Sequence, residues 1–358
     1  MIQTFNKALE YGEKGDFARA EKYYKKCLKS QPGWAEAHLN LGACYKETGR
    51  LRDALREFKI ALVLQPNWSL PNNNIGLIYH NWNQEDIASE YFRTAIKLDP
   101  SYGDAHWNLG LSLLKRDCSS KEGWDEYEWR FKKSGPVRLC LNSTLPLWDG
   151  VSTGRVLVIP EQGLGDFVMF AGYLTSSMTF YAGENIVDLA TALGIPLASD
   201  ESGFDYYIPM GSLPRYCEYT PRDYGTKRIG GGGAGVVWKG SASHGNDKNR
   251  SLFENQLAFV GAATSLQFGV KSTKFKNIDC KNWKDTISAL LQLDYLVSVD
   301  TSIVHVAGAL GIPTICLVPS IDTDFRWGLT GSDNLWYRSV TIARSLKEVE
   351  TYVNRIKA

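Results

Sequence analysis

The sequence predicts a multidomain chain in which an all-α repeat solenoid precedes an α/β region. Three observations lead to this prediction: residues 1–133 repeat with a helical period, residues 134–154 break that pattern as a linker would, and the remaining chain alternates short apolar strands with helices. A chain of 358 residues is also longer than one hydrophobic core usually supports. We expect the α/β region to form two halves, over 155–230 and 231–358, with a helix at the C-terminal end.

The repeat is visible as columns of like residues spaced 34 positions apart. These columns are Pro32, Pro66 and Pro100; Gly42, Gly76 and Gly110; Ala20, Ala54 and Ala88; and Trp34, Trp68 and Tyr102. They resemble the tetratricopeptide repeat, whose unit is two antiparallel helices. Proline cannot continue the second helix, and small residues let two helices approach closely. We expect three repeats, over 1–34, 35–68 and 69–102, and a degenerate fourth to residue 133, which together form an interaction surface.

Composition limits the classes of partner and compartment. Forty Lys and Arg residues against 39 Asp and Glu residues leave a net charge of +1, which gives no support for nucleic-acid binding. The seven cysteines are odd in number and form no C-x-x-C pair, which predicts reduced thiols. The N-terminus lacks the apolar core of a signal peptide, and the most apolar stretch, 303–319, is too broken to span a bilayer. We therefore expect a soluble cytoplasmic protein.

The region beyond residue 155 has the pattern of parallel sheets that are covered on both faces. Short apolar runs at 155–160, 235–239, 294–300 and 313–319 alternate with helical segments such as 301–311. Ligands of open α/β sheets bind beyond the carboxyl ends of the strands. The residues that follow each strand are therefore the candidates for a functional site.

The first candidate segment is EQGLGD, residues 161–166, which follows the first strand. Its glycines, Gly163 and Gly165, let the backbone approach a ligand closely. Asp166 has two interpretations. It is either an N-cap, which contributes about 1 kcal/mol to the helix it starts, or a carboxylate facing the cleft that removes a proton from an attacking hydroxyl. The spacing alone favours the cap.

The second candidate is Lys239, at the end of the strand 235–239, followed by Asn246 and Arg250. A lysine at the ligand end of a strand is a plausible contact for an anion, although most lysines are merely solvated. The glycines at 230–233 precede this strand, and their number indicates a flexible connector more than a phosphate cradle.

The third candidate is Asp300-Thr301-Ser302 with His305, where a strand ends and a helix begins. The first N–H groups of a helix favour an anion by roughly 0.3–1 kcal/mol, and hydroxyls there can donate to a phosphate. In the competing interpretation, Thr301 caps the helix and His305 is a buried histidine whose hydrogen bonds are satisfied. The spacing leaves both interpretations open.

Taken in order, the segments EQGLGDFVMFAGYL, GVVWKGSASHGNDKNRS, VSVDTSIVHVAGALGIPTICLVP and DTDFRW resemble bacterial tetratricopeptide-repeat glycosyltransferases. The catalytic part of that family is related to the ADP-heptose:lipopolysaccharide heptosyltransferases. The resemblance covers nearly the whole chain and implies a GT-B fold, with two shortened Rossmann-like lobes. It implies inverting, metal-independent transfer of a sugar from a nucleotide-sugar donor, with no other cofactor. The repeats would dock a protein or glycan acceptor or mediate homo-oligomer formation.

The resemblance also implies roles for individual residues. Asp166 would be the general base, which is typically worth ~10²–10⁴-fold in rate. The donor-binding residues would be Gly163, Gly165, Lys239, Asp300, Thr301, Ser302 and His305, and further cleft residues would be Gln162, Asn246, Arg250 and Arg326. A lysine, two hydroxyls and a helix N-terminus can stabilise a departing nucleoside diphosphate without a metal ion.

The sequence allows three other interpretations. Asp322-Thr323-Asp324 spells the D-x-D of metal-dependent glycosyltransferases, but it falls within the DTDFRW segment and we expect no metal there. An NAD-dependent oxidoreductase would need G-x-G-x-x-G, and Val168 stands at the third glycine position. The main alternative is a non-catalytic adaptor whose repeats bind a protein, because the lobe at 155–230 is short for an enzyme of this fold.

Overall fold

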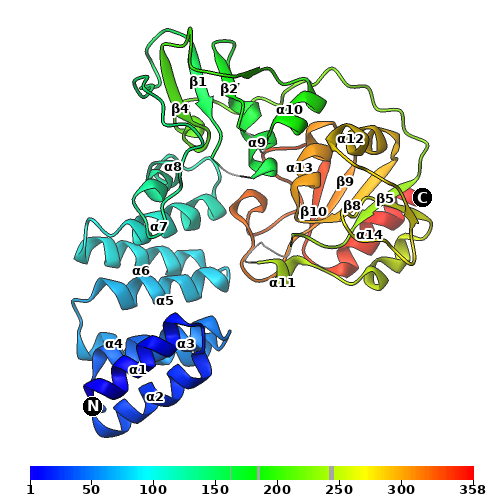
Figure 1. Ribbon diagram of the computed structural model, residues 1–358. Helices are drawn as coiled ribbons and strands as arrows, with labels where there is room; N and C mark the ends of the chain where they lie inside the picture. The colour runs from blue at the N-terminus through cyan, green and yellow to red at the C-terminus, as the bar shows by residue number, and fades with distance from the viewer. Residues whose placement is uncertain (162, 184–185, 242–245) are drawn as a thin grey trace. The chain divides into compact units, whose positions relative to one another are not determined.

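The structure is a computed structural model that describes residues 1–161, 163–183, 186–241 and 246–358. The chain divides into two compact units, Met1–Pro136 and Val137–Ala358, which we call the repeat unit and the second unit (Figure 1). Within the described residues, no helix combines the length and the apolar character needed to cross a membrane.

The repeat unit consists of helices that pack in consecutive pairs (Figure 1). Their bounds are α1 Ile2–Glu13, α2 Phe17–Ser30, α3 Ala35–Glu47, α4 Leu51–Leu64, α5 Ser69–Asn81, α6 Glu85–Leu98, α7 Gly103–Arg116, α8 Lys121–Tyr127 and the short 3₁₀ helix η1 Glu128–Phe131. The helical hairpins predicted from the 34-residue period are confirmed.

The glycine column explains how close the paired helices lie. A Cβ atom at Gly42 would lie 2.6 Å from the ring of Phe58, and one at Gly76 would lie 2.5 Å from the ring of Phe92. Both rings are fully buried. A side chain at either glycine would therefore displace the aromatic ring that fills the space between two helices.

Buried charges in the repeat unit have oppositely charged partners. Lys115 Nζ lies 3.0 Å from Glu85 Oε1, with both side chains inaccessible to solvent. His80 Nδ1 lies 2.7 Å from the other Glu85 oxygen. Burial opposes ionisation of Glu85, but His80 and Lys115 together hold its pKa below the ordinary value. The same arrangement recurs at His38 Nδ1, which lies 2.7 Å from Glu57 Oε2.

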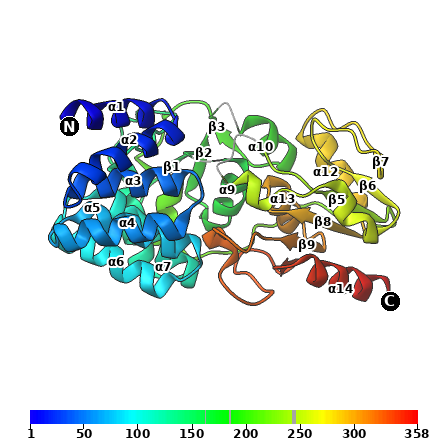
Figure 2. The ribbon, with the colours of Figure 1, turned by 90° about the horizontal axis from the view of Figure 1, so that it is seen from below.

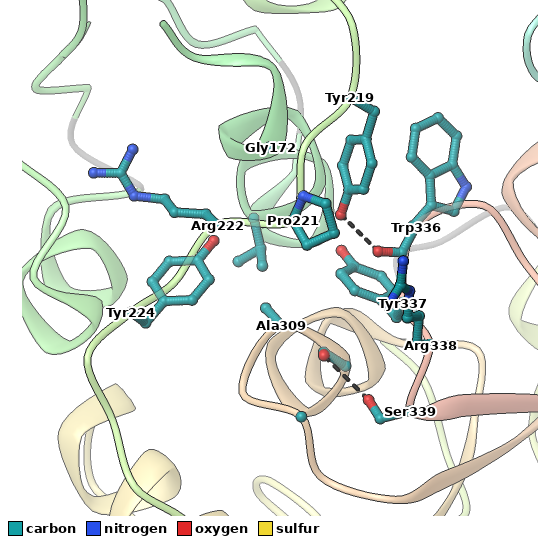
Figure 3. A pocket seen from close by; sticks show the side chains of 13 residues that line it. Gly172, Tyr219, Pro221, Arg222, Tyr224, Ala309, Trp336, Tyr337, Arg338 and Ser339 are labelled. Carbon is teal, nitrogen blue, oxygen red and sulfur yellow. Dashed lines mark hydrogen bonds between the residues drawn. The ribbon is translucent and has the colours of Figure 1, made fainter. Parts of the chain in front are cut away.

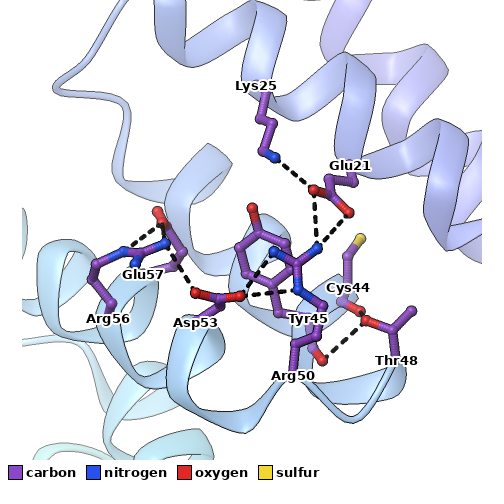
Figure 4. Close-up of polar contacts among 9 residues, drawn as sticks. All are labelled: Glu21, Lys25, Cys44, Tyr45, Thr48, Arg50, Asp53, Arg56 and Glu57. Atoms are coloured by element: carbon purple, nitrogen blue, oxygen red, sulfur yellow. Dashed lines mark hydrogen bonds and ion pairs between the residues drawn. The ribbon is translucent and has the colours of Figure 1, made fainter.

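A more exposed network links the first repeat to the second (Figure 4). Arg50 reaches Glu21 at 3.1 Å and Asp53 at 2.8 Å, and its guanidinium lies 4.1 Å from the ring centre of Tyr45. Lys25 shares Glu21, at 2.6 Å. Exposed ion pairs contribute little stability individually, so this network mainly fixes how α2 meets the turn before α4.

The second unit contains two sheets, and every strand pair in them is parallel. The first sheet has the order β3-β2-β1-β4 and the second β10-β9-β8-β5-β6-β7. The strands are β1 Val156–Ile159, β2 Met178–Tyr181, β3 Leu197–Ala198, β4 Tyr206–Pro209, β5 Ala234–Val237, β6 Ala263–Ser265, β7 Lys276–Asn277, β8 Tyr295–Val299, β9 Thr314–Leu317 and β10 Val340–Ala343. The predicted parallel sheets are confirmed, and the four predicted apolar strands are β1, β5, β8 and β9.

Helices cover the second sheet on both faces, as its continuous apolar strands require (Figures 1 and 2). On one face, Val349 and Val353 of α14 pack with Leu257 of η4 against Val236 and Val297 of the strands. The other face carries α12 and α13. The helices of this unit are α9 Leu164–Phe170, η2 Ala171–Tyr173, α10 Val187–Leu193, η3 Met210–Arg215, α11 Asp247–Arg250, η4 Glu254–Val260, α12 Trp283–Gln292, α13 Ser302–Ala309, η5 Phe325–Trp327 and α14 Leu346–Lys357.

The segment that leads into β1 packs on the first sheet. The Trp148 backbone N–H donates to the Tyr207 carbonyl at 2.8 Å, and the Trp148 ring meets Tyr216 edge-on at 5.8 Å. A side chain at Gly150 would overlap the same Tyr216 ring. The second unit therefore begins at Val137, inside the segment 134–154 that the sequence marked as a linker.

Candidate functional site

The loop after β1 starts helix α9 with a glycine. Gly163 is the N-cap, and Asp166 is the third residue of the helix. The Asp166 carboxylate accepts a hydrogen bond from the Gly163 backbone N–H, as an acid at this position often does. The interpretation of Asp166 as the N-cap is therefore wrong, because the helix begins three residues earlier than that interpretation places it. Gln162, a predicted cleft residue, lies outside the described residues.

Helices α9 and α13 meet at Gly165. A Cβ atom at Gly165 would lie 2.7 Å from His305 Cδ2, so glycine is needed for this approach. His305 is buried, its Nδ1 lies 3.1 Å from the Tyr337 hydroxyl, and its ring lies 5.1 Å from that of Trp327. Burial lowers the pKa of His305 to about 3, so the ring is neutral near pH 7. This is the environment that the competing interpretation of His305 describes.

An arginine joins two of the acidic side chains. Arg326 donates through Nη2 to the Asp166 carboxylate and through Nη1 to both oxygens of Asp324, each at 2.7 Å. Burial raises the pKa of Asp166, although Arg326 opposes the shift. At Asp324 burial is outweighed by the bonds from Arg326, and the pKa is lowered. The sequence predicted Arg326 only as a cleft residue and considered Asp324 only as part of a metal motif.

Asp300 directly follows β8, beside the same group of charges. Burial, and next the charge of Asp324, raise the pKa of Asp300 to about 6. Arg250 donates to the Asp300 backbone carbonyl at 2.9 Å. Three carboxyl groups, on Asp166, Asp300 and Asp324, therefore lie within electrostatic reach of two guanidinium groups, on Arg326 and Arg250. We call these five residues the acidic cluster.

Thr301 occupies the N-cap of α13 but does not cap it with its side chain. Its hydroxyl lies instead 3.4 Å from Ser298 Oγ. Ser302 is the first helical residue and is half-buried. Thr301 is therefore at the predicted N-cap position, but its side chain does not form the predicted capping hydrogen bond. The first N–H groups of α13 gain no acceptor from it.

The remaining predicted residues differ in their surroundings. Asn246 Nδ2 donates to the Asp322 carbonyl at 2.8 Å, which ties the start of α11 to the segment that carries Arg326. Lys239 is exposed, and its backbone N–H donates to Gln267 Oε1 at 2.9 Å.

The glycine run before β5 is an ordered connector. The Asp294 carboxylate accepts from the Gly231 N–H at 2.7 Å and from the Gly233 N–H at 3.0 Å. A Cβ atom at Gly232 would lie 2.6 Å from the Gln292 carbonyl oxygen. A carboxylate of the chain itself thus occupies the position at which a phosphate cradle would hold its ligand.

A cavity of about 450 Å³ lies beside the C-terminal end of α13 (Figure 3). Residues of α9 and η2, the segment 219–224, the end of α13 and the segment 336–339 line it. None of the predicted donor-binding residues is among them. The sequence did not reveal this cavity, because Tyr219 and Tyr224 lie in no motif and the Trp336-Tyr337 pair carries no ligand signal by itself.

The structure groups no side chains as a metal site and forms no disulfide within the described residues. Over the described parts of the chain, no three or more His, Cys, Asp or Glu side chains are grouped so that they could hold a metal ion. All seven cysteines are free thiols.

Comparison with known proteins identifies the repeats. Residues 13–70 and 71–102 match family models described as tetratricopeptide repeat. No curated protein matches the chain. Residues 13–102 are therefore tetratricopeptide repeats, and the family matches do not reach the second unit.

Solved structures of repeat proteins are similar to part of the chain. A crystal structure of MamA is 29% identical over 34% of this chain and 71% of its own, with a TM-score of 0.32. PilW, a type IV pilus biogenesis factor, is 25% identical over 35% of this chain and 58% of its own, with a TM-score of 0.33. The first TPR of Spaghetti (RPAP3), bound to an HSP90 peptide, is 17% identical over 30% of this chain and 86% of its own, with a TM-score of 0.30.

Proposed function

We propose that the repeat unit binds a partner protein and that the second unit transfers a sugar from a nucleotide-sugar to an acceptor hydroxyl. The match of residues 13–102 to tetratricopeptide repeats carries the first part, because stacked helical repeats present extended binding surfaces. The second part rests on the resemblance of four segments to glycosyltransferases and on the position of the acidic cluster.

The partner surface that we propose lies along α4. A shallow groove there is lined by Arg52, Leu55, Arg56, Lys59, Ile60, Val63 and Leu64, which we call the α4 surface. Val63 is 80% exposed. Within the described chain, Arg52 and Lys59 have no ion-pair partner. An apolar strip beside unpaired cations fits a partner segment that carries aliphatic side chains next to Asp or Glu.

The position of the acidic cluster supports glycosyl transfer. Asp166 follows β1, Asp300 follows β8 and Arg326 follows β9, so residues far apart in the chain converge at the carboxyl ends of parallel strands. Ligands of parallel sheets bind at that edge. A carboxyl group whose pKa is raised by burial is also a stronger base than an ordinary aspartate.

In the proposed reaction, the acceptor hydroxyl replaces the nucleoside diphosphate at the anomeric carbon of the donor sugar. The acceptor oxygen forms a bond to the anomeric carbon while the bond from that carbon to the donor diphosphate breaks. Asp166 takes the hydroxyl proton, and the electron pair leaves with the nucleoside diphosphate. The start of α13, with Thr301 and Ser302, would stabilise the leaving group. The ion pair between Arg326 and Asp166 has to open first, and the donor diphosphate is an anion that can compete for Arg326.

A second candidate function is a non-catalytic adaptor in which the second unit is structural. Arg326 already bonds to Asp166, and three carboxyl groups outnumber two guanidinium groups, which disfavours a diphosphate. The comparisons also support protein binding more directly than catalysis, since the family matches end at residue 102.

Donor binding and turnover separate the two candidates. The full chain is titrated calorimetrically with UDP, GDP, ADP and CMP and assayed for sugar release from UDP-, GDP-, ADP- and CMP-sugars. As a glycosyltransferase it binds at least one nucleotide, and Asp166→Asn lowers turnover at least ~100-fold while donor binding is retained. The matched control is Asp279→Asn, at a carboxylate that is 85% exposed, and it leaves turnover unchanged. An absence of binding at millimolar nucleotide establishes the adaptor.

A further inference from the structure

We propose that the cavity beside the C-terminal end of α13 binds a small anion that carries an aromatic ring. Its volume of about 450 Å³ lies in the range typical of ligand pockets, roughly 300–1,000 Å³. The cavity shares no lining residue with the predicted donor site, so its ligand goes beyond the proposed function.

Aromatic rings form the walls, and glycines hold them in place. A Cβ atom at Gly308 would lie 2.5 Å from the Tyr337 ring, and one at Gly172 would overlap the Tyr219 ring. The Tyr219 hydroxyl donates to the Trp336 carbonyl at 2.6 Å, which fixes its ring (Figure 3). These surfaces exist before a ligand arrives, so a flat ring can pack on them with little reordering.

The charge of the lining is positive. Arg222 and Arg338 are both lining residues, although the Arg222 guanidinium extends away from the aromatic rings (Figure 3), and no acidic side chain lines the cavity. Within the described residues, neither guanidinium has an ion-pair partner. Two unpaired arginines beside a cavity without a carboxylate favour an anionic ligand, and a guanidinium matches phosphate and carboxylate oxygens in geometry.

The polar groups of the lining favour an aromatic ring over a sugar ring. Sugar hydroxyls need acceptors, and no Asp, Glu, Asn or Gln side chain lines the cavity. The Tyr224 hydroxyl is protonated at neutral pH, as an ordinary tyrosine is, and burial raises its pKa further to about 12. The lining thus offers donors for an anionic group and apolar faces for a ring.

The probe is 1-naphthyl phosphate, titrated calorimetrically into the full chain, with inorganic phosphate and 1-naphthol as the two half-probes. We expect the complete probe to bind at least tenfold more tightly than either half. The double variant Arg222→Gln/Arg338→Gln is expected to weaken it at least about tenfold, since hydrogen bonds to charged groups are lost. Ala309→Phe fills the cavity and is expected to abolish binding. Arg138→Gln, at an exposed arginine elsewhere in the unit, serves as the matched control.

Three results would overturn the assignment. The first is equal affinity for 1-naphthol and 1-naphthyl phosphate. The second is unchanged affinity for 1-naphthyl phosphate in a cavity variant that unfolds at the wild-type temperature. The third is displacement of the probe by excess UDP. The last result would place the probe at the proposed donor site. A chain that binds the probe but no nucleotide supports this cavity while refuting the proposed donor site.

Discussion

The repeat unit and the second unit bury charge in different ways. In the repeat unit, Glu85 is enclosed with Lys115 and His80, and its pKa is lowered despite burial. In the second unit, burial outweighs the neighbouring arginines at Asp166 and Asp300, and the pKa of each is raised. The first arrangement stabilises the fold at neutral pH, whereas the second holds charge at a cost in stability. Such a cost is typical of functional sites.

The largest effect expected in this comparison comes from Lys115→Met. The substitution keeps the apolar stem but leaves Glu85 buried with only His80 as a charged partner, so we expect a loss of about 3–5 kcal/mol in the free energy of unfolding. Urea unfolding of the full chain measures the loss. The exposed Lys121→Met should change stability by less than about 0.5 kcal/mol. Equal effects of the two substitutions would show that the buried pair contributes nothing specific.

Asp300→Asn should increase the free energy of unfolding, whereas Lys115→Met should decrease it. The pKa of Asp300 is about 6 in the folded protein against an ordinary 3.8, so the folded state retains a proton that the unfolded chain has lost. Stability from the neutral carboxyl is therefore present below pH 4 and lost as the pH rises through 6. The uncharged amide removes this loss, and we expect a gain of about 2–3 kcal/mol at pH 8 and almost none at pH 3.

Urea unfolding at the two pH values tests this sign. Asp279→Asn, at an exposed carboxylate, is the control and should show no such pH dependence. A loss of stability in Asp300→Asn at pH 8 would mean that the arginines of the acidic cluster compensate the charge of Asp300, as Lys115 and His80 compensate that of Glu85.

The smallest of these effects concerns packing in the repeat unit. Gly76→Ala places a methyl group 2.5 Å from the buried Phe92 ring, and we expect a loss of about 1–3 kcal/mol. Gly12→Ala, also in a helix but with no atom within 4 Å, should gain about 0.4–1 kcal/mol. Thermal unfolding of the two variants provides the measurement. A gain in both would show that the helices of a repeat can separate without cost.

The sequence predicted the repeat unit in detail because its contacts are local and recur. Gly42 and Phe58 lie in neighbouring helices of one repeat, and the next pair follows 34 positions later, so each column of the alignment reports one contact. The strands β1, β5, β8 and β9 were predictable for a related reason, since strands buried on both faces are continuously apolar.

The contacts of the candidate site could not be predicted in the same way. Asp166 and Arg326 are 160 positions apart, and their ion pair depends on how α9 packs against α13, which no local pattern encodes. The helix start was misplaced because an aspartate is a common N-cap, whereas Gly163 takes that position and Asp166 bonds back to it. The aromatic cavity involves Tyr219 and Tyr224 in an irregular segment without periodicity.

Partner binding through the α4 surface is common to both candidate functions, and photo-crosslinking in cells that make the protein tests it most directly. A photoreactive phenylalanine derivative replaces Val63 in one variant and, in the other, Ile229 of the second unit, which is 74% exposed. We predict a distinct crosslinked protein at position 63 only, attached through a segment rich in Asp or Glu, and its loss when Arg52 and Lys59 are changed to Glu. The same crosslinked proteins at both positions, or crosslinking at position 63 that survives the charge reversal, would contradict partner binding at this surface.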